Sequence, residues 1–317
     1  MGTPHEAARI GASGRRRVDV GDWATGRKLS LDNLKVVLIA LIIAIHGILG
    51  YVGSDQFWSY ADVQEVVLSP VTEIVLLAAI VPFGLFMIAL LFLVAGLLSR
   101  PSLERKGPGR FAADRLLRLG VPFALFTFAL WPLLMYALYH PLGAAPGSYW
   151  AEFLDENGHL DTGPMWFVGV LLIYSLGYAT WIALRRRTVG DVDRLRRRAG
   201  SERAISVRTL LMLAAVVTAA SFLVRLVFPY ASEDITDLNL WEWPACFALF
   251  ALGIVASRQG WLSAVPRTLR RQCFWITLAA AAMTAAFAVM GARLGLLGQF
   301  FGGWTWTALL FPALEAP

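Results

Sequence analysis

The stretch LKVVLIALIIAIHGILGY, residues 34–51, is apolar apart from the basic side chains of Lys35 and His46. A helix needs about 20 mostly apolar residues to cross the hydrocarbon core of a bilayer, so this stretch predicts a membrane-spanning helix. The rest of the chain has the same character, since 57% of its 317 residues are hydrophobic and only 16% are charged. This composition and a mean hydropathy of +0.61 exclude a soluble globular domain.

Further apolar stretches of spanning length follow along the chain, and an eighth begins near residue 300. We therefore predict an all-α, polytopic membrane bundle of about eight spans, with a basic N-terminal tail (1–30) and one membrane domain (31–317). No small-residue cleavage site follows the first apolar run, which favours a retained signal anchor over a removed signal peptide. The predicted spans are 34–51, 74–98, 119–139, 165–184, 210–229, 240–257 and 273–292.

Lysine and arginine are distributed unequally between the connecting segments. If the N-terminus is cytoplasmic, the inner segments hold 25 of the 28 basic residues, whereas the outer segments hold only Arg293 and most of the acidic residues. Positive residues favour the cytoplasmic side, so the pattern predicts a multi-pass protein of the cell membrane with a cytoplasmic N-terminus. The pI near 9.6 follows from this topology and does not indicate nucleic-acid binding.

His46 is the first candidate for chemistry, because ionisable groups at membrane depth are costly and commonly functional. Lys35 lies eleven positions earlier, which returns it to nearly the same helix face at an axial distance of about 16 Å. An alternative is that Lys35 anchors the helix at the interface while His46 is a hydrogen-bonded packing residue. The two readings remain open from this segment alone.

A second candidate site lies where an inner segment enters the third predicted span. Arg115 and Arg118 are three positions apart, so a helix places them on one face. Guanidinium groups bind phosphates by geometry as well as by charge, and the pair would suit a phosphorylated cytoplasmic ligand. Charge anchoring at the membrane surface is the alternative. Pro122 is expected to disturb this helix by removing a backbone hydrogen bond.

The outer segment 143–164 is longer than a simple connection and combines carboxylates, an amide and aromatic side chains. Such groups suit a hydroxyl-rich acceptor, because hydroxyls need hydrogen-bond acceptors and sugar rings pack on flat apolar faces. His159, Asp161 and Trp166 are the candidate acceptor-binding residues, although ordinary loop polarity explains the charges equally well.

Several function classes lack their required motifs. No Walker loop, dinucleotide fingerprint or His-x-x-x-His pair occurs, and the two cysteines show no metal-binding spacing. No metal site is therefore predicted.

The ordered motifs resemble the membrane acyltransferase 3 family, and within it the branch of periplasmic glucan succinyltransferases. The resemblance begins near residue 29 and is carried by Leu31-Asp-Asn-Leu-Lys35 with His46, Phe92-Leu-Val-Ala-Gly96, Arg115-Leu-Leu-Arg118 with Pro122, Met165-Trp-Phe167, and Phe250-Ala-Leu-Gly253 with Gly260-Trp-Leu262. It implies an integral-membrane O-acyltransferase that moves an acyl group from cytoplasmic acyl-CoA, such as acetyl- or succinyl-CoA, to an extracytoplasmic hydroxyl, often of a carbohydrate. No tightly bound cofactor is implied.

The resemblance assigns His46 as the catalytic residue and Lys35, Arg115 and Arg118 as donor-binding residues. Lys35 replaces the usual arginine, which keeps the charge but loses bidentate recognition. The family usually has more spans, so we expect the chain to lack the last helices, as a fragment or as a shortened, inactive variant.

Burial in a helix bundle disfavours the imidazolium, so a neutral His46 is expected to accept a proton from the acceptor hydroxyl. A covalent acyl-imidazole is the alternative route, and the sequence does not identify the group that orients the ring. A transporter or flippase of a glycan or lipid precursor is the competing class, since discontinuous helices with Gly and Pro are typical of transporters.

Overall fold

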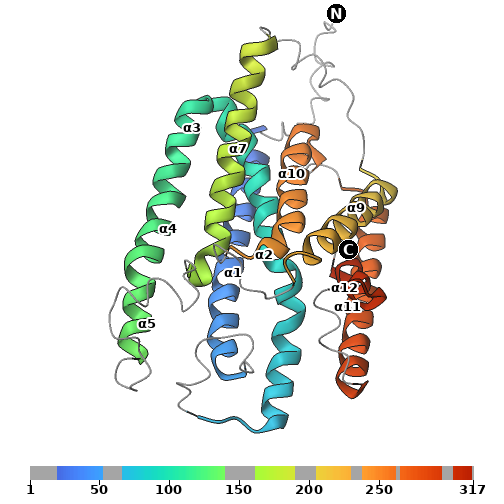
Figure 1. Ribbon diagram of the computed structural model, residues 1–317. Coiled ribbons are helices and arrows are strands. Elements are labelled where there is room, and N and C mark those ends of the chain that lie inside the picture. The colour runs from blue at the N-terminus through green and yellow to red at the C-terminus, as the bar shows by residue number, and fades with distance from the viewer. Residues whose placement is uncertain are drawn as a thin grey trace, which may run out of the picture.

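The computed structural model describes residues 20–52, 66–139, 161–189, 205–229, 238–261, 265–294 and 303–315. Every regular element in these ranges is a helix, and most of the helices run roughly along one common direction (Figure 1). The long elements are α1 (Val20–Val52), α2 (Pro70–Lys106), α7 (Trp166–Val189), α9 (Val207–Arg225), α10 (Trp243–Gln259) and α11 (Arg267–Leu294). The predicted all-α polytopic class is confirmed.

The next long helix after α2, called here the third long helix, is built from five short pieces between residues 108 and 139. These are α3 (Pro108–Arg115), η2 (Leu116–Gly120), α4 (Val121–Leu125), η3 (Phe126–Leu130) and α5 (Trp131–Tyr139). The remaining elements are short, namely η5 (Gly163–Met165), η7 (Leu240–Glu242) and α12 (Trp306–Glu315).

Six helices among the described residues are long and apolar enough to cross a membrane. They are Asn33–Val52, Phe86–Lys106, Pro108–Ala137, Gly163–Arg186, Val207–Arg225 and Leu240–Gln259. Each overlaps one of the first six predicted spans, but the second begins later than the predicted 74–98 and the third begins earlier than the predicted 119–139. The seventh predicted span falls within α11, which has 28 residues. Helix α12 covers part of the eighth, and its 10 residues are about half of what a perpendicular crossing requires.

Helix α2 is the central element, because it packs against α1, α3, α7 and α10. Its longest contact is with α10, where Gly96 and Gly253 let the two backbones touch. A Cβ atom on Gly96 would overlap the carbonyl oxygen of Phe250, and one on Gly253 would overlap the carbonyl oxygen of Leu93. Small residues permit this close approach between membrane helices, so two motifs far apart in the sequence meet in one crossing.

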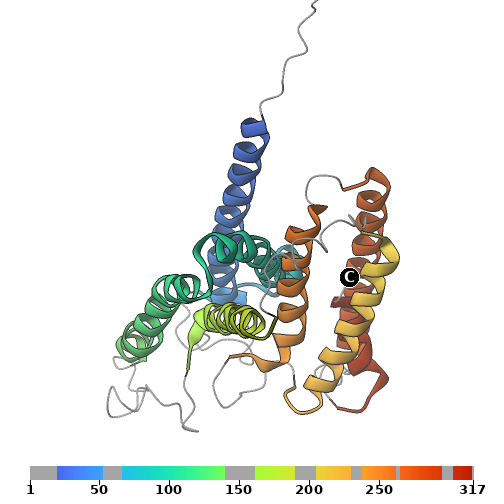
Figure 2. The same cartoon turned by 90° about the horizontal axis from the view of Figure 1, so that it is seen from above.

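The helices form two groups, which Figure 2 shows from above. Helices α1 to α7 lie on one side, α9, α11 and α12 lie on the other, and α10 lies between them. Many large apolar side chains on the outward faces are exposed, including Ile43, Leu117, Val216 and Phe274. An apolar outer surface is the one that lipid tails solvate, as expected for membrane-spanning helices.

The chain reverses direction between α2 and α3 at Gly107, whose φ is 76°. Its backbone N–H donates to the Leu103 carbonyl oxygen at 2.8 Å, and its own carbonyl oxygen accepts from Phe111 N–H at 3.0 Å. A positive φ favours glycine, and Pro108 then begins the next helix at a position that needs no N–H donor. This turn brings the start of the third long helix against the end of α2.

Candidate functional site

His46 lies in the apolar part of α1, six residues before the helix ends at Val52. The helix packs against α2 through Leu38, Ile45 and Val52, which contact a cluster that includes Met87. His46 itself is half-buried. The sequence places it in this position because the leucine, isoleucine and alanine residues around it favour a helix that is buried in protein or lipid.

The imidazole of His46 is held by its own helix. Its Nδ1 atom lies 2.8 Å from the carbonyl oxygen of Ile42, one turn earlier. A carbonyl oxygen only accepts hydrogen bonds, so Nδ1 carries the proton and the neutral ring has its lone pair on Nε2. The Ile42 carbonyl is thus the orienting group that the sequence did not identify.

Lys35 and His46 belong to one uninterrupted helix, so their predicted alignment along α1 holds. Both side chains are half-buried. Eleven residues at 1.5 Å per residue separate them by about 16 Å along the axis. The structure therefore keeps a cation near one end of the span and a titratable ring toward the other.

Arg115 and Arg118 lie on the same helix, but their surroundings differ. Arg115 is half-buried, its Nη2 donates to Ser99 Oγ at 3.3 Å, and its guanidinium carbon lies 5.1 Å from the Phe111 ring centroid. The Arg118 side chain is 72% exposed and pairs through Nε with Asp114 Oδ1 at 3.0 Å. The two guanidinium groups are therefore near each other in sequence but are not held as one matched pair.

Asp114 connects two cations at this end of the bundle. Its Oδ2 lies 2.9 Å from Lys106 Nζ, while its Oδ1 pairs with Arg118. Three charged side chains thus form a small network between the end of α2 and the start of the third long helix. The two cations and one carboxylate carry one net positive charge, and ion pairs near the protein surface contribute modestly to stability.

Two π-helical segments widen the third long helix, and each ends two residues before a proline. Segment η2 precedes Pro122 and η3 precedes Pro132. Val121 N–H donates to Leu116 O, and Trp131 N–H donates to Phe126 O, so the widened turns are hydrogen-bonded. Proline lacks an N–H and crowds the preceding turn, and a wider turn accommodates it. The disturbance predicted at Pro122 is present, and the helix continues through it.

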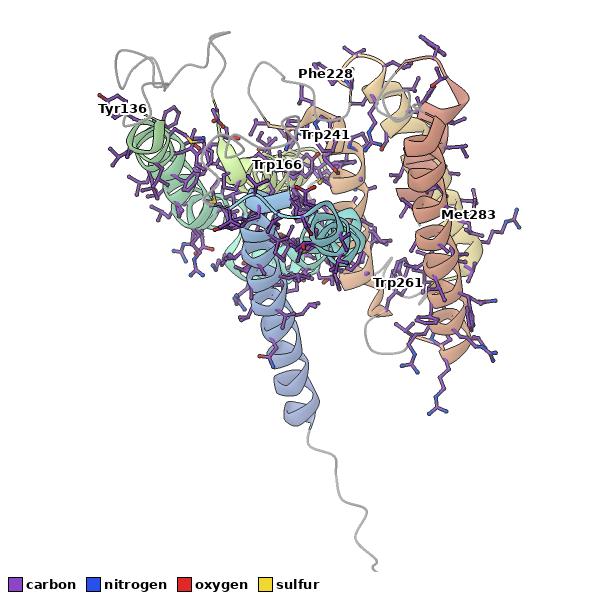
Figure 3. The ribbon with its side chains drawn as sticks, turned by 90° about the horizontal axis from the view of Figure 1, so that it is seen from below. Tyr136, Trp166, Phe228, Trp241, Trp261 and Met283 are labelled. Carbon is purple, nitrogen blue, oxygen red and sulfur yellow. The ribbon has the colours of Figure 1, made fainter. Side chains whose placement is uncertain are left out.

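The predicted acceptor residues are only partly described. Asp161 accepts from Trp131 Nε1 at 2.6 Å and from Gly163 N–H at 2.7 Å. Trp166 is 8% exposed and belongs to a buried cluster with Phe92. Figure 3 shows Trp166 among the helices rather than at the rim of the molecule. His159 lies outside the described residues.

Tyr174 organises the aromatic cluster beneath Trp166. Its hydroxyl donates to the Trp243 carbonyl oxygen at 2.9 Å, and its ring lies 5.7 Å from Phe92 and 5.5 Å from Phe247. These contacts join α2, α7 and α10 in one core. Sequence reasoning missed Tyr174 and Ser99, because neither spacing nor composition distinguishes an inward-facing tyrosine or serine from its neighbours on a membrane helix.

Arg225 is a further cation at membrane depth. It is 3% exposed at the end of α9, and its guanidinium carbon lies 5.8 Å from the Trp241 ring centroid. A cation over an indole face is stabilised by the ring quadrupole. The residue is therefore packed inside the protein.

The comparisons with known proteins give one match. The sequence model of a family described as an acyltransferase domain matches residues 28–314. The search of curated proteins and the search of solved structures found no match to the chain.

Proposed function

Because the chain belongs to the membrane acyltransferase 3 family, we propose that it is an integral-membrane O-acyltransferase. It takes an acyl group from acyl-CoA and delivers it to a hydroxyl of an extracytoplasmic acceptor, a carbohydrate. Acetyl-CoA and succinyl-CoA are the donors to test first. The family match supports acyl transfer, and the donor, acceptor and site residues are the proposal.

The observation that carries the proposal is the state of His46. The ring lies in an apolar span, and its Nδ1–H donates to the Ile42 carbonyl oxygen at 2.8 Å. This hydrogen bond selects the tautomer whose Nε2 accepts a proton, as a general base requires. A packing histidine would also be hydrogen-bonded, so the replacement of His46 described below distinguishes the two roles.

The proposed reaction needs no group beyond this base and the two substrates. Nε2 of His46 takes the proton of the acceptor hydroxyl while the hydroxyl oxygen attacks the thioester carbonyl carbon. A carbon–oxygen bond forms, the carbon–sulfur bond breaks, and the CoA thiolate leaves and receives the proton from the imidazolium. A positioned base contributes typically about 10²–10⁴ in rate.

The cations at one end of the bundle are the proposed contacts for the anionic part of the donor. Arg115 on the third long helix contacts Ser99 near the end of α2 that carries Arg105 and Lys106, and Lys35 lies on α1 eleven residues before His46. Phosphate groups bind arginine through charge-assisted hydrogen bonds. Arg118 adds positive charge but shares Asp114 with Lys106, so its contribution is the smaller one.

We place the protein in the cell membrane with its N-terminus in the cytoplasm. The described helix ends support this orientation, because the ends of α7 and α10 and the starts of α9 and α11 carry arginines, whereas the starts of α2 and α10 carry Glu73 and Glu242. The arginines are Arg185, Arg258, Arg208 and Arg267. Positively charged ends remain on the cytoplasmic side during insertion. The donor is then bound from the cytoplasm, and the acceptor is bound at the opposite end, where α7 begins with the buried Trp166.

The test is the replacement His46→Gln in cells that express the protein. Glutamine keeps a hydrogen-bonding side chain of similar size but cannot act as a base, so the variant is expected to be made normally and to lose acyl transfer by at least about 100-fold. Mass spectrometry of surface carbohydrates measures the acyl groups added. Gly47→Ala is the matched control, because a Cβ atom there meets nothing within 4 Å.

The measured acylation distinguishes the acyltransferase from the transporter. Acylation that persists at the wild-type level in His46→Gln excludes His46 as the catalytic residue. A wild-type protein that adds no acyl group from either donor, but changes the export of a glycan or lipid precursor, would instead support the transporter. Loss of acylation in the Gly47→Ala control would show that α1 tolerates no change near His46. The loss in His46→Gln would then no longer indicate that His46 acts as a base.

A further inference from the structure

Ser99 is a fully buried polar residue near the end of α2, with 0% of its surface exposed. Two hydrogen bonds meet at its hydroxyl. Its Oγ donates to the Ala95 carbonyl oxygen at 2.7 Å, and it accepts from Arg115 Nη2 at 3.3 Å. Because the carbonyl takes the hydroxyl proton, the oxygen lone pairs face the guanidinium, and the direction of both bonds is fixed.

Arg115 is held on a second side by an aromatic ring. Its guanidinium carbon lies 5.1 Å from the centroid of Phe111, one turn earlier on the same helix. A hydroxyl at one edge and a ring against the side chain restrict the guanidinium much more than either contact would alone. Arg115 is thus pre-organised on α3 by a residue that α2 supplies.

The neighbouring carboxylate, Asp114, forms its ion pairs with two other cations and not with Arg115. Asp114 pairs with Lys106 at 2.9 Å and with Arg118 at 3.0 Å, and Arg115 makes no ion pair with any described residue. Its Nε is enclosed and has no hydrogen-bond partner within the described ranges. Arg118, by contrast, is 72% exposed and already paired. The two arginines of the sequence motif therefore have different roles.

We propose that Ser99 is a positioning residue, which holds the Arg115 guanidinium in the orientation that binds the phosphate groups of the acyl donor. This inference rests on the proposed function, because it assigns Arg115 to donor binding. Arg118 then supplies charge and a link to Asp114, and its orientation is not essential. The alternative is that Ser99 only fills space between α2 and the third long helix.

The replacements Ser99→Ala and Ser99→Cys separate these two roles. Cysteine keeps the volume but hydrogen-bonds weakly, so both variants are expected to raise the KM for acetyl-CoA or succinyl-CoA by about tenfold. The kcat is expected to stay within about twofold, because the residue does not touch the reacting atoms. Purified protein in nanodiscs, assayed with both donors, gives these values.

The coupling between Ser99 and Arg115 is the decisive measurement. Arg115→Ala is expected to raise the donor KM more than Arg118→Ala does, and adding Ser99→Ala to Arg115→Ala is expected to raise it no further. Ser175→Ala is the matched control, since Ser175 is also 0% exposed but its hydroxyl makes no hydrogen bond with any described residue. Its donor KM is expected to equal that of the wild type.

The outcomes distinguish this inference from the proposed function. A wild-type KM in Ser99→Cys, or an additive effect of Ser99→Ala and Arg115→Ala, overturns the positioning role and leaves the acyltransferase intact. A wild-type protein that neither binds nor uses either donor overturns both. If Ser99→Ala does not fold, Ser99→Cys carries the test, because it leaves no cavity.

Discussion

At the scale of single residues, the carboxylate of Asp161 connects the third long helix to the segment before α7. One of its oxygens accepts from the Trp131 indole and the other from Gly163 N–H. Gly163 has a φ of 49° and lies against the Trp131 ring, where a Cβ atom would come within 2.6 Å of the indole. The contacts among these three residues hold the third long helix against the start of α7, whose first residue is Trp166.

Asp161→Asn is therefore expected to lower stability. An amide has one acceptor oxygen, so one of the two N–H groups would face its NH2, and hydrogen bonds to charged groups contribute about 1.5–3 kcal/mol. The same replacement is expected to cost less in a Trp131→Phe background, because the indole donor is already gone. Thermal unfolding of the four proteins in detergent measures this coupling.

An acceptor-binding role for Asp161 makes a different prediction. The variant would then unfold at the wild-type temperature and show a higher KM for the acceptor, and the two replacements would be additive in stability. Such a result would remove the structural interpretation of the Asp161 contacts.

The residue types at the site were predictable from sequence, but their partners were not. The alignment of Lys35 and His46 on one face of an apolar helix could be predicted from the sequence, because helical periodicity depends only on local spacing. The hydrogen bond from His46 to the Ile42 carbonyl oxygen could not be predicted, because every residue carries a carbonyl group and only the orientation of the imidazole determines which one it contacts. The contact between Ser99 and Arg115 could not be predicted, because it depends on the turn at Gly107 that brings the third long helix back against α2.

At the scale of elements, the crossing of α2 and α10 joins the two halves of the described chain. Gly96 and Gly253 face each other's backbones, and the Gly253 Cα lies 3.2 Å from where a Cβ on Gly96 would be. A side chain at either glycine would overlap backbone atoms, which cannot move aside by changing rotamer as side-chain atoms can. The crossing also sets the position of Ser99, one turn further along α2.

Gly96→Ala and Gly253→Ala are each expected to destabilise the protein by about 3 kcal/mol, at the upper end of overpacking effects. The double variant is expected to lose less than the sum, because separating the helices once relieves both overlaps. Thermal unfolding and the yield of monodisperse protein in detergent report the loss.

Gly177→Ala provides the control for these glycines. A Cβ atom there meets nothing within 4 Å, and alanine favours a helix over glycine by roughly 0.5–1 kcal/mol. Equal destabilisation at Gly96 and Gly177 would contradict a backbone-to-backbone crossing.

Helix positions followed from apolar length, whereas internal irregularities did not. The sequence predicted a third span over 119–139, and the helix in fact begins at Pro108 and carries two π-helical segments. Pro122 indicated a local disturbance, but a proline alone does not distinguish a kink, a break or a widened turn. The packing of this helix along α7 favours the hydrogen-bonded widened turn.

At the scale of the whole molecule, charge is separated along the direction of the helices. Basic residues lie in the last turn of α2 and in the first turns of α11, including Arg105, Lys106 and Arg270. The acidic Glu73 lies at the other end of α2. At 1.5 Å per residue the 37 residues of α2 extend about 55 Å, which exceeds a hydrocarbon core of about 30 Å. Both ends of α2 therefore reach water.

This geometry makes the orientation testable with two cysteines in a background that carries Cys246→Ala and Cys273→Ala. Val67→Cys lies three residues before α2, where Val67 is 88% exposed, and Gly109→Cys lies at the basic end, where a Cβ atom meets nothing within 4 Å. A membrane-impermeant maleimide is expected to label Val67→Cys in intact cells and Gly109→Cys only after permeabilisation, since basic ends remain in the cytoplasm. The reverse pattern would place Arg115 outside, away from cytoplasmic acyl-CoA, and would overturn the proposed direction of transfer together with the inferred role of Ser99.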